Sequence, residues 1–439
     1  MLLSRHFFRS LALSSLAGLA AAAHGQTLPE VVRYSLEHYP QVLAAQAKAL
    51  AADADIDKAR SAHMPQVSLT ASSNHYGSGS VPASVGATSL SPTARVNLWS
   101  GGRIEADADR ARAQSRSSHL SSQVTQDDVA LLASEAYLNW AKAADLYQLA
   151  VKNMQLHAEV LEDIRVIAQT DTGRRIDFDQ ASVRLENARL ILQQRKSDLA
   201  QAMQKMQRFW PDDLGARPEG LDVTMGPEGY FSNLPTSAAA AGDSVSDTLP
   251  AIAQYVEQVN AAQAAVRMAK GLYWPSLDVV TSRQYNTNTL KQDYLTQLQL
   301  NMPLYSGGSV SAQVKAAEQQ LKASQLSLDE ARLVQREKAV LAWQEWAATR
   351  TRSDVGDAQS DIGEKVVQGY RQQFKLAKRS LLDLLNIQAD SFGYRSAAIA
   401  AFHEERIARA RLLATTGQLA QRFSGDQPQA SDTDANTPS

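Results

Sequence analysis

The chain of 439 residues contains no cysteine. This absence excludes disulfide bonds, thiolate metal sites, a cysteine nucleophile and an N-terminal lipidated cysteine. The sequence also lacks a nucleophile–base constellation, a P-loop and a glycine-rich dinucleotide turn. Histidines are scattered without ligand spacing, as at His63, His75, His119 and His157. We therefore expect no enzyme activity, no metal site and no cofactor.

Long apolar runs are also missing once the N-terminal region has passed. No later stretch reaches about 18 uncharged apolar residues, the length that a transmembrane helix requires. At the N-terminus, Arg5 and Arg9 precede an apolar run from Leu11 to Ala23, which is the layout of a secretory signal peptide. About a dozen apolar residues are too few for an anchor. We place the signal peptide at residues 1–25 and expect cleavage after Ala23 or Gly25.

An excess of charge of one sign is absent as well. The 44 basic residues stand against 46 acidic ones, for a formal net charge of −2. Nothing in this balance suggests a nucleic-acid partner. An exported chain of this kind is periplasmic, secreted or an outer-membrane β-barrel. Residues 424–439 are polar, with proline, glycine and aspartate, and predict a disordered tail.

The sequence does contain a duplication. Leu98–Gly102 (Leu-Trp-Ser-Gly-Gly) returns as Leu304–Gly308 (Leu-Tyr-Ser-Gly-Gly), at an offset of 206 residues. Each copy closes a strand-like segment and opens a long helical one rich in alanine and glutamine. Paired prolines repeat at an offset of 210, Pro40 and Pro65 returning as Pro250 and Pro275. A duplication of this length predicts one architecture made of two similar halves.

These marks divide the chain into two repeats. We place the first repeat at residues 26–210 and the second at 249–423. The residues between them, 211–248, are rich in glycine, proline and alanine and form a linker that we expect to wrap the outside of the helices.

Each repeat carries two segments in which apolar and polar residues alternate. The predicted strands are about 66–76, 89–99, 276–286 and 294–305. Alternation over about ten residues is typical of an outer-membrane barrel strand. A soluble hairpin packed on a helix alternates in the same way, so the pattern alone leaves both possibilities open.

Long helices are predicted where proline is missing. No proline interrupts the pattern from Gly102 to Thr170 or from Gly308 to Lys375, and a continuous helix of about 65 residues would be roughly 100 Å long. The alternative is several kinked helices, which Gly356, Gly363 and Gly369 would allow in the second half. Shorter helices are expected beside the long ones, at Pro40–Ala62, Ile176–Arg208, Pro250–Lys270 and Ser380–Leu419.

Four strands cannot close a transmembrane barrel, because the smallest has about eight. Lipid does not tolerate open sheet edges. If these strands enter a membrane, several chains must therefore share one barrel, and their helices would form a shared cylinder on the periplasmic side. The alternative is a periplasmic coiled-coil scaffold with no pore.

Taken together, the motifs resemble those of the TolC family of outer-membrane channel proteins. The resemblance covers about Thr27–Phe423 and rests on the paired strand-end motifs, the prolines before the hairpins and two helix-turn segments. Those segments are Gly-Arg-Arg-Ile-Asp-Phe-Asp at 173–179 and Ala-Lys-Arg-Ser-Leu-Leu-Asp-Leu-Leu at 377–385.

The resemblance implies a fold that is mainly α with a small β part. Three chains would share a 12-stranded barrel in the outer membrane, in contact with its lipid, and a long α-helical barrel extending into the periplasm. A periplasmic adaptor (membrane fusion) protein and an inner-membrane ABC transporter would complete the duct, or alternatively a proton-driven efflux pump. Within the family, residues 378–385 look most like members that serve type I protein secretion, and the second interpretation is multidrug efflux.

The resemblance also implies a periplasmic gate. In the family, rings of aspartate and an arginine-centred link between neighbouring coils hold the tunnel shut. Asp383 matches one ring aspartate, Arg379 the linking arginine and Asp179 an acidic partner in the other coil. Phe374 stands where the family can place a hydrogen-bonding tyrosine, and Asn386 where a second ring aspartate can occur. One or two acidic rings therefore both stay possible.

Physical reasoning supports part of this assignment. Carboxylates brought together by symmetry repel, so a closed ring of Asp383 needs cationic partners. From the residues alone, the favoured interpretation is that Arg379 and Asp383 form a surface pair worth about 0.3–0.5 kcal/mol, and the resemblance reverses this preference. The turns that would contact the adaptor contain Thr172, Gly173, Arg174, Arg175, Ala377, Lys378 and Ser380.

Aromatic residues follow the duplication. Trp343 and Trp346 align with Tyr137 and Trp140 at the offset of 206. Such pairs serve packing, and Trp343 and Trp346 could also brace the linker. Trp99 and Tyr305 end strands, where they could anchor at a membrane interface or pack at the junction with the helices.

Overall fold

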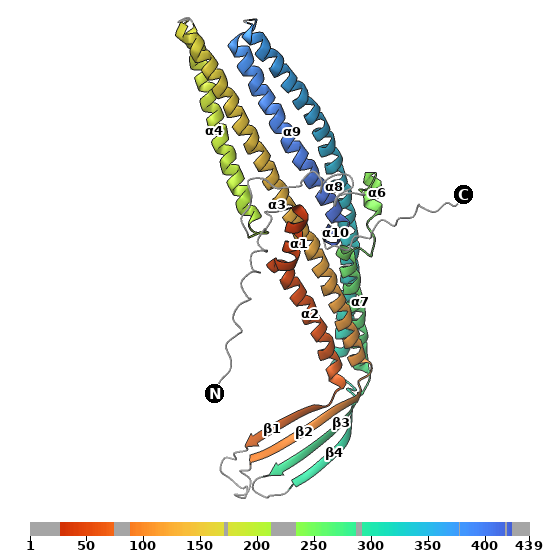
Figure 1. The fold of residues 1–439 in the computed structure, drawn as a ribbon. Helices are drawn as coiled ribbons and strands as arrows, with labels where there is room; N and C mark the ends of the chain where they lie inside the picture. Colours follow the sequence, from red (N-terminus) through yellow and green to blue (C-terminus); the bar gives the residue numbers. More distant parts are fainter. Residues whose placement is uncertain are drawn as a thin grey trace, which may run out of the picture.

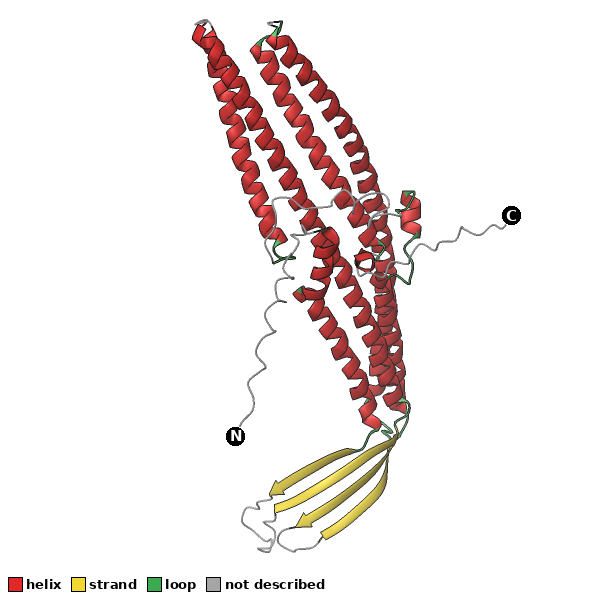
Figure 2. Ribbon diagram, in the orientation of Figure 1, coloured by secondary structure: helices red, strands yellow, loops and turns green. Residues whose placement is uncertain are grey.

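The computed structural model describes residues 27–73, 88–170, 174–211, 234–286, 292–376, 378–417 and 419–423. The predicted signal peptide, the predicted tail and residues 212–233 of the linker lie outside the described residues. The described part is elongated, with a small sheet at one end and long helices that run from it to the opposite end (Figure 1). Figure 2 shows that helix predominates, which confirms the predicted class of a mainly α chain with a small β part.

Two helices run nearly the whole length of the helical part. They are α3 (Arg103–Thr170) and α8 (Ser309–Lys375), with 68 and 67 residues. At 1.5 Å per residue each is about 100 Å long, which confirms the prediction of uninterrupted helices. In α8, a Cβ atom on Gly363 would lie 3.1 Å from Cδ2 of Tyr394. The glycine therefore allows α8 to approach its neighbour closely, rather than breaking the helix.

Two shorter helices accompany each long one and follow one another from the sheet towards the far end (Figure 1). Beside α3 they are α2 (Pro40–Arg60) and α4 (Arg175–Met206), and beside α8 they are α7 (Pro250–Lys270) and α9 (Leu381–Thr415). α9 ends before the predicted Leu419, because Gly417 adopts a left-handed φ of 63° that stops the helix. The short α10 (Leu419–Phe423) follows.

The four strands form one antiparallel sheet in the order β1-β2-β3-β4. They are β1 (Gln66–Ser73), β2 (Thr88–Trp99), β3 (Ser276–Asn286) and β4 (Gln292–Asn301). Because β2 pairs with β3, the hairpins of the two repeats are joined into a single sheet. β4 ends before the predicted Tyr305, since β3 begins at Ser276, opposite Asn301, and offers no pairing partner beyond that point.

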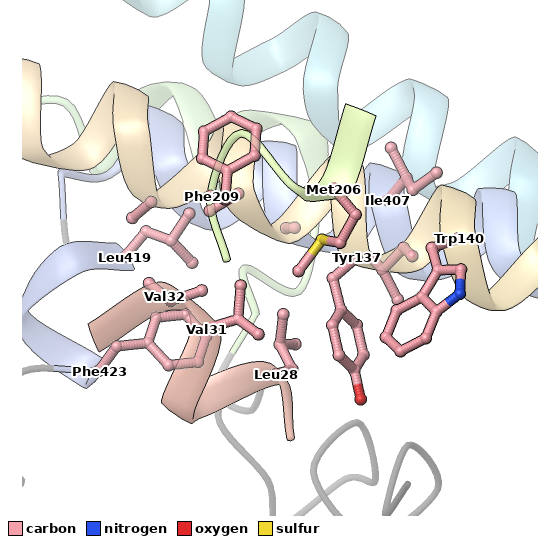
Figure 3. Packing of buried hydrophobic residues seen from close by; sticks show 14 of the residues in the cluster. Leu28, Val31, Val32, Tyr137, Trp140, Met206, Phe209, Ile407, Leu419 and Phe423 are labelled. Carbon is pink, nitrogen blue, oxygen red and sulfur yellow. The ribbon is translucent and has the colours of Figure 1, made fainter. Parts of the chain in front are cut away.

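The core is concentrated about halfway along the helices. Helix α1 (Leu28–His38) packs here against α3, the end of α4 and α10 (Figure 3). The largest fully buried side chains of the chain include Trp140 and Tyr137, whose rings meet edge to face at 5.7 Å between centroids. The buried residues of this cluster that Figure 3 labels are Leu28, Val31, Val32, Tyr137, Trp140, Met206, Phe209, Ile407, Leu419 and Phe423.

The described part of the linker repeats this arrangement on the second long helix. Helix α6 (Ala238–Asp243) packs on α8 beside Trp343 and Trp346, the counterparts of Tyr137 and Trp140. Trp343 donates its indole N–H to the carbonyl oxygen of Pro235 at 2.9 Å. The interpretation that these aromatics brace the linker is thus confirmed for Trp343.

Candidate functional site

The sheet has one apolar and one mainly polar face, as its register shows. Val67 lies opposite Ala94, Val96 opposite Val279, and Leu277 opposite Leu300, so these residues share one face. The opposite face carries the residues between them, which are Ser68, Thr70, Thr93, Arg95, Asn97, Asp278, Ser282, Gln297 and Gln299. Val280 and Leu295 are apolar exceptions on this face. The apolar face suits lipid, and the polar face suits a water-filled interior.

Both edges of this sheet are open within the described chain. β1 pairs only with β2 and β4 only with β3, which leaves one row of backbone N–H and C=O groups on each outer strand. Every residue of β1 is exposed. In a hydrocarbon environment such rows must be paired, so these edges are candidate contact sites for further copies of the chain.

A charged cluster joins the two hairpins where the sheet meets the helices. Arg95 of β2 contacts Asp278 of β3 at 2.6 Å, and the Asn97 amide donates to the other carboxylate oxygen of Asp278 at 2.9 Å. The Asp278 side chain is only 2% exposed. These residues line a cavity of about 720 Å³ together with Arg103 and Asp107. A buried carboxylate that needs two specific partners stabilises this register over a shifted one.

The tips of the two helical hairpins lie at the end opposite the sheet (Figure 1). An apolar cluster joins them there: Val160 and Ile164 of α3 and Ala181 of α4 pack with Leu381 and Leu385 of α9. Phe374, predicted to lie in the gate, is partly buried against this cluster. Its role in this structure is therefore apolar packing between the coils.

Two polar links also cross between the hairpins near this end. Arg371 of α8 forms an ion pair with Glu159 of α3 at 2.9 Å. Arg184 of α4 donates to the side-chain oxygen of Asn386 of α9, also at 2.9 Å. The structure thus brings Asn386 to the other coil, as a partner of arginine. Sequence reasoning missed Glu159, Arg184 and Arg371, because they are ordinary surface residues of long helices and carry no motif.

The other predicted gate residues lie nearby but do not contact one another. Arg379 donates to the Gln373 side chain at 3.0 Å, and its guanidinium lies 4.5 Å from the centre of the Tyr370 ring. Asp383 lies in the first turn of α9, where its backbone N–H donates to Ser380 Oγ at 3.1 Å. Asp179 is exposed on α4. Among the described ion pairs, none joins Arg379 to Asp383 within the chain.

The predicted adaptor-contact turns are partly described. Arg174 immediately precedes α4 and Arg175 is its exposed first residue. Lys378 is exposed, and Ser380 is the N-cap of α9. Thr172, Gly173 and Ala377 lie outside the described residues.

A buried histidine lies close to one of the cross-coil links. His157 of α3 is 5% exposed. Its pKa is lowered, first by burial, which disfavours the charged ring, and second by the positive charge of Arg184. The neutral ring is therefore favoured beside Arg184 when the coils are packed as they are here.

Exposed apolar residues form stripes on two helices. On α4 they recur every seven residues, at Ile176, Val183 and Leu190. On α8 they recur at close to the same spacing, at Leu326, Leu333, Leu341, Val355 and Ile362. A heptad stripe is the pattern by which one helix packs along another. Within the described chain these stripes remain exposed.

Two kinds of feature are absent from the described ranges. No group of three or more histidine, aspartate or glutamate residues in these ranges could hold a metal ion. None of the helices they contain combines the length and the apolar character needed to cross a membrane.

Comparison with known proteins places these features in context. The family model described as outer membrane efflux protein matches residues 31–210 and 245–418. The outer membrane efflux protein BepC of Brucella suis is 24% identical over 375 residues, covering 84% of this chain and 80% of BepC. The toluene efflux pump outer membrane protein TtgC of Pseudomonas putida is also 24% identical, covering 68% of this chain and 62% of TtgC.

Solved structures share the fold. A crystal structure of CusC, from work on its folding and transmembrane channel formation, has a TM-score of 0.77 at 16% identity and covers 92% of this chain and 95% of CusC. The open state of the Neisseria gonorrhoeae MtrE outer membrane channel has a TM-score of 0.72 at 16% identity, covering 92% and 93% of the two chains. The four-stranded sheet with long helical hairpins is thus the fold of these channel proteins.

Proposed function

Since the chain belongs to the outer membrane efflux protein family, a family of channel components of tripartite export systems rather than of enzymes, we propose that it is the exit duct of a type I protein secretion system. The observation that carries the duct is the sheet, with one apolar face, one mainly polar face and two open edges, at the end of helices about 100 Å long. Such a sheet lies in the outer membrane, and the helices extend from it into the periplasm.

The duct requires more than one chain. Four strands are about half of the smallest barrel, so three chains, β4 of each paired with β1 of the next, give a barrel of twelve strands. The exposed stripes on α4 and α8 support the same assembly, because they would pack between neighbouring chains. The polar face of the sheet would line the pore and the apolar face would contact lipid.

The gate would lie at the hairpin tips. The apolar cluster around Ile164 and Leu385 and the links Arg371–Glu159 and Arg184–Asn386 hold the two hairpins together within one chain. In a trimer, Asp383 and Asp179 would approach their symmetry copies, with Arg379 as the cation between neighbouring coils. Breaking these contacts would let the hairpins separate and the tunnel widen.

The partners follow from the same arrangement. A periplasmic adaptor would bind the turns at the tips through Arg174, Arg175, Lys378 and Ser380, together with Thr172, Gly173 and Ala377. An inner-membrane ABC transporter would supply the cargo. Protein cargo is proposed on the resemblance of residues 378–385 to members that serve type I secretion.

A second candidate function is the outer-membrane component of a multidrug efflux pump. It is favoured by the names of the relatives, which include an antibiotic efflux pump outer membrane protein, ArpC, and the toluene efflux pump protein TtgC, both of Pseudomonas putida. In that case a proton-driven pump would replace the ABC transporter.

Comparing a deletion strain with its parent separates the two functions. Loss of one or a few large proteins from the medium and cell surface, with drug tolerance unchanged, would support type I secretion. Lower drug tolerance with an unchanged set of exported proteins would support efflux. If neither property changed, both candidate functions would be wrong.

A further inference from the structure

The internal duplication holds at the level of individual strand pairs. In the first hairpin Gln66 lies opposite Arg95, and in the second Ser276 lies opposite Asn301. An offset of 210 residues converts Gln66 of the first strand into Ser276, and an offset of 206 converts Arg95 of the second strand into Asn301. At the other end, Ser73 opposite Thr88 becomes Arg283 opposite Tyr294 by the same offsets. The two hairpins therefore have one register, and a contact made by one repeat predicts the matching contact of the other.

One such contact is made in only one repeat. We call Leu98–Gly102 the first knuckle and Leu304–Gly308 the second knuckle. The first knuckle docks on residues 271–274 of the other repeat: a Cβ atom on Gly101 would lie 2.5 Å from Cβ of Trp274. The second knuckle has no such docking contact among the described residues, since no described atom lies within 4 Å of a Cβ atom on Gly307. Leu304 and Tyr305 are 88% and 90% exposed.

The second knuckle nevertheless has the conformation of the first. Gly101 and Gly102 have φ values of 66° and 78°, and Gly307 and Gly308 have 63° and 80°. Glycine accepts these left-handed values without the steric cost that other residues incur. The shape that docks in the first repeat is thus already formed in the second, where the Ser309 N–H donates to the Ser306 carbonyl oxygen within the turn and no described residue of the other repeat docks on it.

We propose that the second knuckle docks on residues 61–64 of the next copy of the chain, and that β4 pairs with β1 of that copy in the register of β2 and β3. Within the chain Ala94 lies opposite Thr281 and Arg95 opposite Val280. The offsets convert these pairs into Leu300 opposite Ala71 of the partner subunit and Asn301 opposite Thr70 of the partner subunit. This inference rests on the proposed function, because it supplies the contact that closes the shared barrel.

The faces of the strands agree with this register. Leu300 and Ala71 belong to the apolar face of the sheet, and Asn301 and Thr70 belong to the mainly polar face. A slip of one residue would exchange the two faces of one strand and place its apolar side chains on the mainly polar face of the sheet. Pro303 is the counterpart of Asn97 at the offset of 206. In the first repeat, the pairing of β2 with β3 is irregular between Asn97 and Trp99. Such an irregularity is one of the positions at which a sheet accepts proline.

The side chains differ between the docking contact seen within the chain and the proposed contact between chains, and they differ on both sides of the contact. A Cβ atom on Gly271 would lie 2.5 Å from Arg103 Cγ and 2.9 Å from the backbone oxygen of Gly101, so this position has room only for hydrogen. At the proposed contact Gly271 is replaced by Ser61, and the bulky Arg103 by the small Ser309. The smaller Ser309 thus removes the side-chain clash with the larger Ser61. The backbone oxygen of Gly307, the counterpart of the Gly101 oxygen, requires the second knuckle to dock slightly farther from Ser61 than the first knuckle does from Gly271.

The charged cluster follows the same rule. Arg95 and Asp278 form a close ion pair between β2 and β3. Their counterparts are Asn301 and Ser68, both uncharged. The two charges are therefore lost together, so the proposed contact leaves no unpaired charge at the matching position.

Engineered cysteines test the proposal cleanly, because the chain has no native cysteine. The variant A71C/L300C, kept full-length in outer-membrane preparations, places thiols at the proposed opposed pair. These positions lie on the two outer strands of the sheet, so one chain cannot bridge them. After oxidation with copper phenanthroline we expect covalent dimers and trimers on denaturing gels without reductant.

Three further variants complete the test. The matched control A94C/T281C carries the same pair within one chain, and should lose its free thiols while keeping the mass of a single chain. A71C/N301C, in which the second thiol points to the opposite face, should give no cross-link. M64C/Y305C tests the docked knuckle at two exposed positions, and should also give dimers and trimers.

The outcomes separate the inference from the proposed function. The protein could form trimers on unheated gels but cross-link at neither A71C/L300C nor M64C/Y305C, or cross-link equally well at A71C/N301C. Either outcome would overturn the inference and leave the duct intact. Chains that reach the outer membrane only as monomers would overturn both.

Discussion

Asp127 of α3 accepts a hydrogen bond of 2.8 Å from the backbone N–H of Ala420 in α10. The contact spans 293 residues of sequence and fixes the C-terminal helix to the middle of the long helix. Gly417 lies beside the same carboxylate, and a Cβ atom there would be 3.6 Å from Asp127 Oδ2. The end of the second repeat is thus held beside the buried core that lies about halfway along the helices.

The first prediction concerns the pH dependence of this contact. Burial is the main cause that raises the pKa of Asp127 from 3.8 to about 6, against the backbone donors that lower it. Between these values the folded chain binds more protons at Asp127 than the unfolded chain, so the free energy of unfolding falls as the pH rises. The loss continues as the pH rises through the folded pKa of about 6, and amounts to about 3 kcal/mol at most.

Asp127→Asn keeps a side-chain oxygen for Ala420 and removes the titration. Melting temperatures in detergent should show the wild type losing stability relative to Asp127→Asn between pH 4 and 7. The difference between the two proteins isolates this carboxyl from other titrating groups. A difference that stays constant with pH would contradict the assignment.

The second prediction concerns the cross-coil links at the hairpin tips. Arg184→Ala and Arg371→Ala each remove one link, worth up to about 1 kcal/mol for exposed groups. We expect ion leak through planar bilayers to rise by up to about fivefold for each, and further for the double variant. Arg379→Ser and Asp383→Ala should also raise leak if these residues connect neighbouring chains.

Arg189→Ala and Arg165→Ala are the matched controls. Among the described residues, each of these arginines pairs only within its own helix, Arg189 with Glu186 and Arg165 with Glu162. These variants should conduct as the wild type does. Equal leak from controls and link variants would show that surface charge, rather than the links, sets the conductance.

The third prediction concerns the bracing of the linker. Trp343→Phe keeps an aromatic ring against α6 and removes the N–H that donates to Pro235. Loss of one such hydrogen bond costs about 1 kcal/mol, so proteolytic cleavage of the linker should become roughly fivefold faster. The matched variant Trp346→Phe removes a donor to Glu405 instead and should leave linker cleavage unchanged. Cleavage accelerated by both or by neither would contradict the brace.

The fourth prediction compares two neighbouring glycines. Gly101→Ala and Gly102→Ala both place a side chain at a left-handed φ, which costs roughly 1–2 kcal/mol. Only at Gly101 does the new Cβ atom meet Trp274, because nothing lies within 4 Å of that position at Gly102. The yield of folded protein in the outer membrane should therefore fall further for Gly101→Ala. Equal yields would mean that the first knuckle does not need its close contact.

Much of this fold could be predicted from the sequence, because a repeated motif and a periodic pattern are visible in the residues themselves, without knowledge of tertiary contacts. The motif at Leu98–Gly102 and its return at Leu304–Gly308 correctly predicted two hairpins opening two long helices. The missing prolines correctly predicted that α3 and α8 are unbroken. The end of α9 was missed, since the left-handed turn at Gly417 is one residue in an otherwise helical pattern.

The tip contacts were harder to predict for a different reason. Arg184 and Asn386 are 202 residues apart, and only the packing of α4 against α9 brings them together. The same holds for Arg371 and Glu159. The resemblance assigns Arg379 and Asp383 to contacts between neighbouring chains, and the residue spacing of one chain does not encode such contacts.

Native mass spectrometry of the protein extracted from outer membranes in mild detergent tests the central claim most directly. A duct whose barrel is shared between chains predicts a complex with three times the mass of one mature chain, because the described part of each chain contributes four strands. A stable species with the mass of a single chain would contradict the shared barrel and the duct that depends on it.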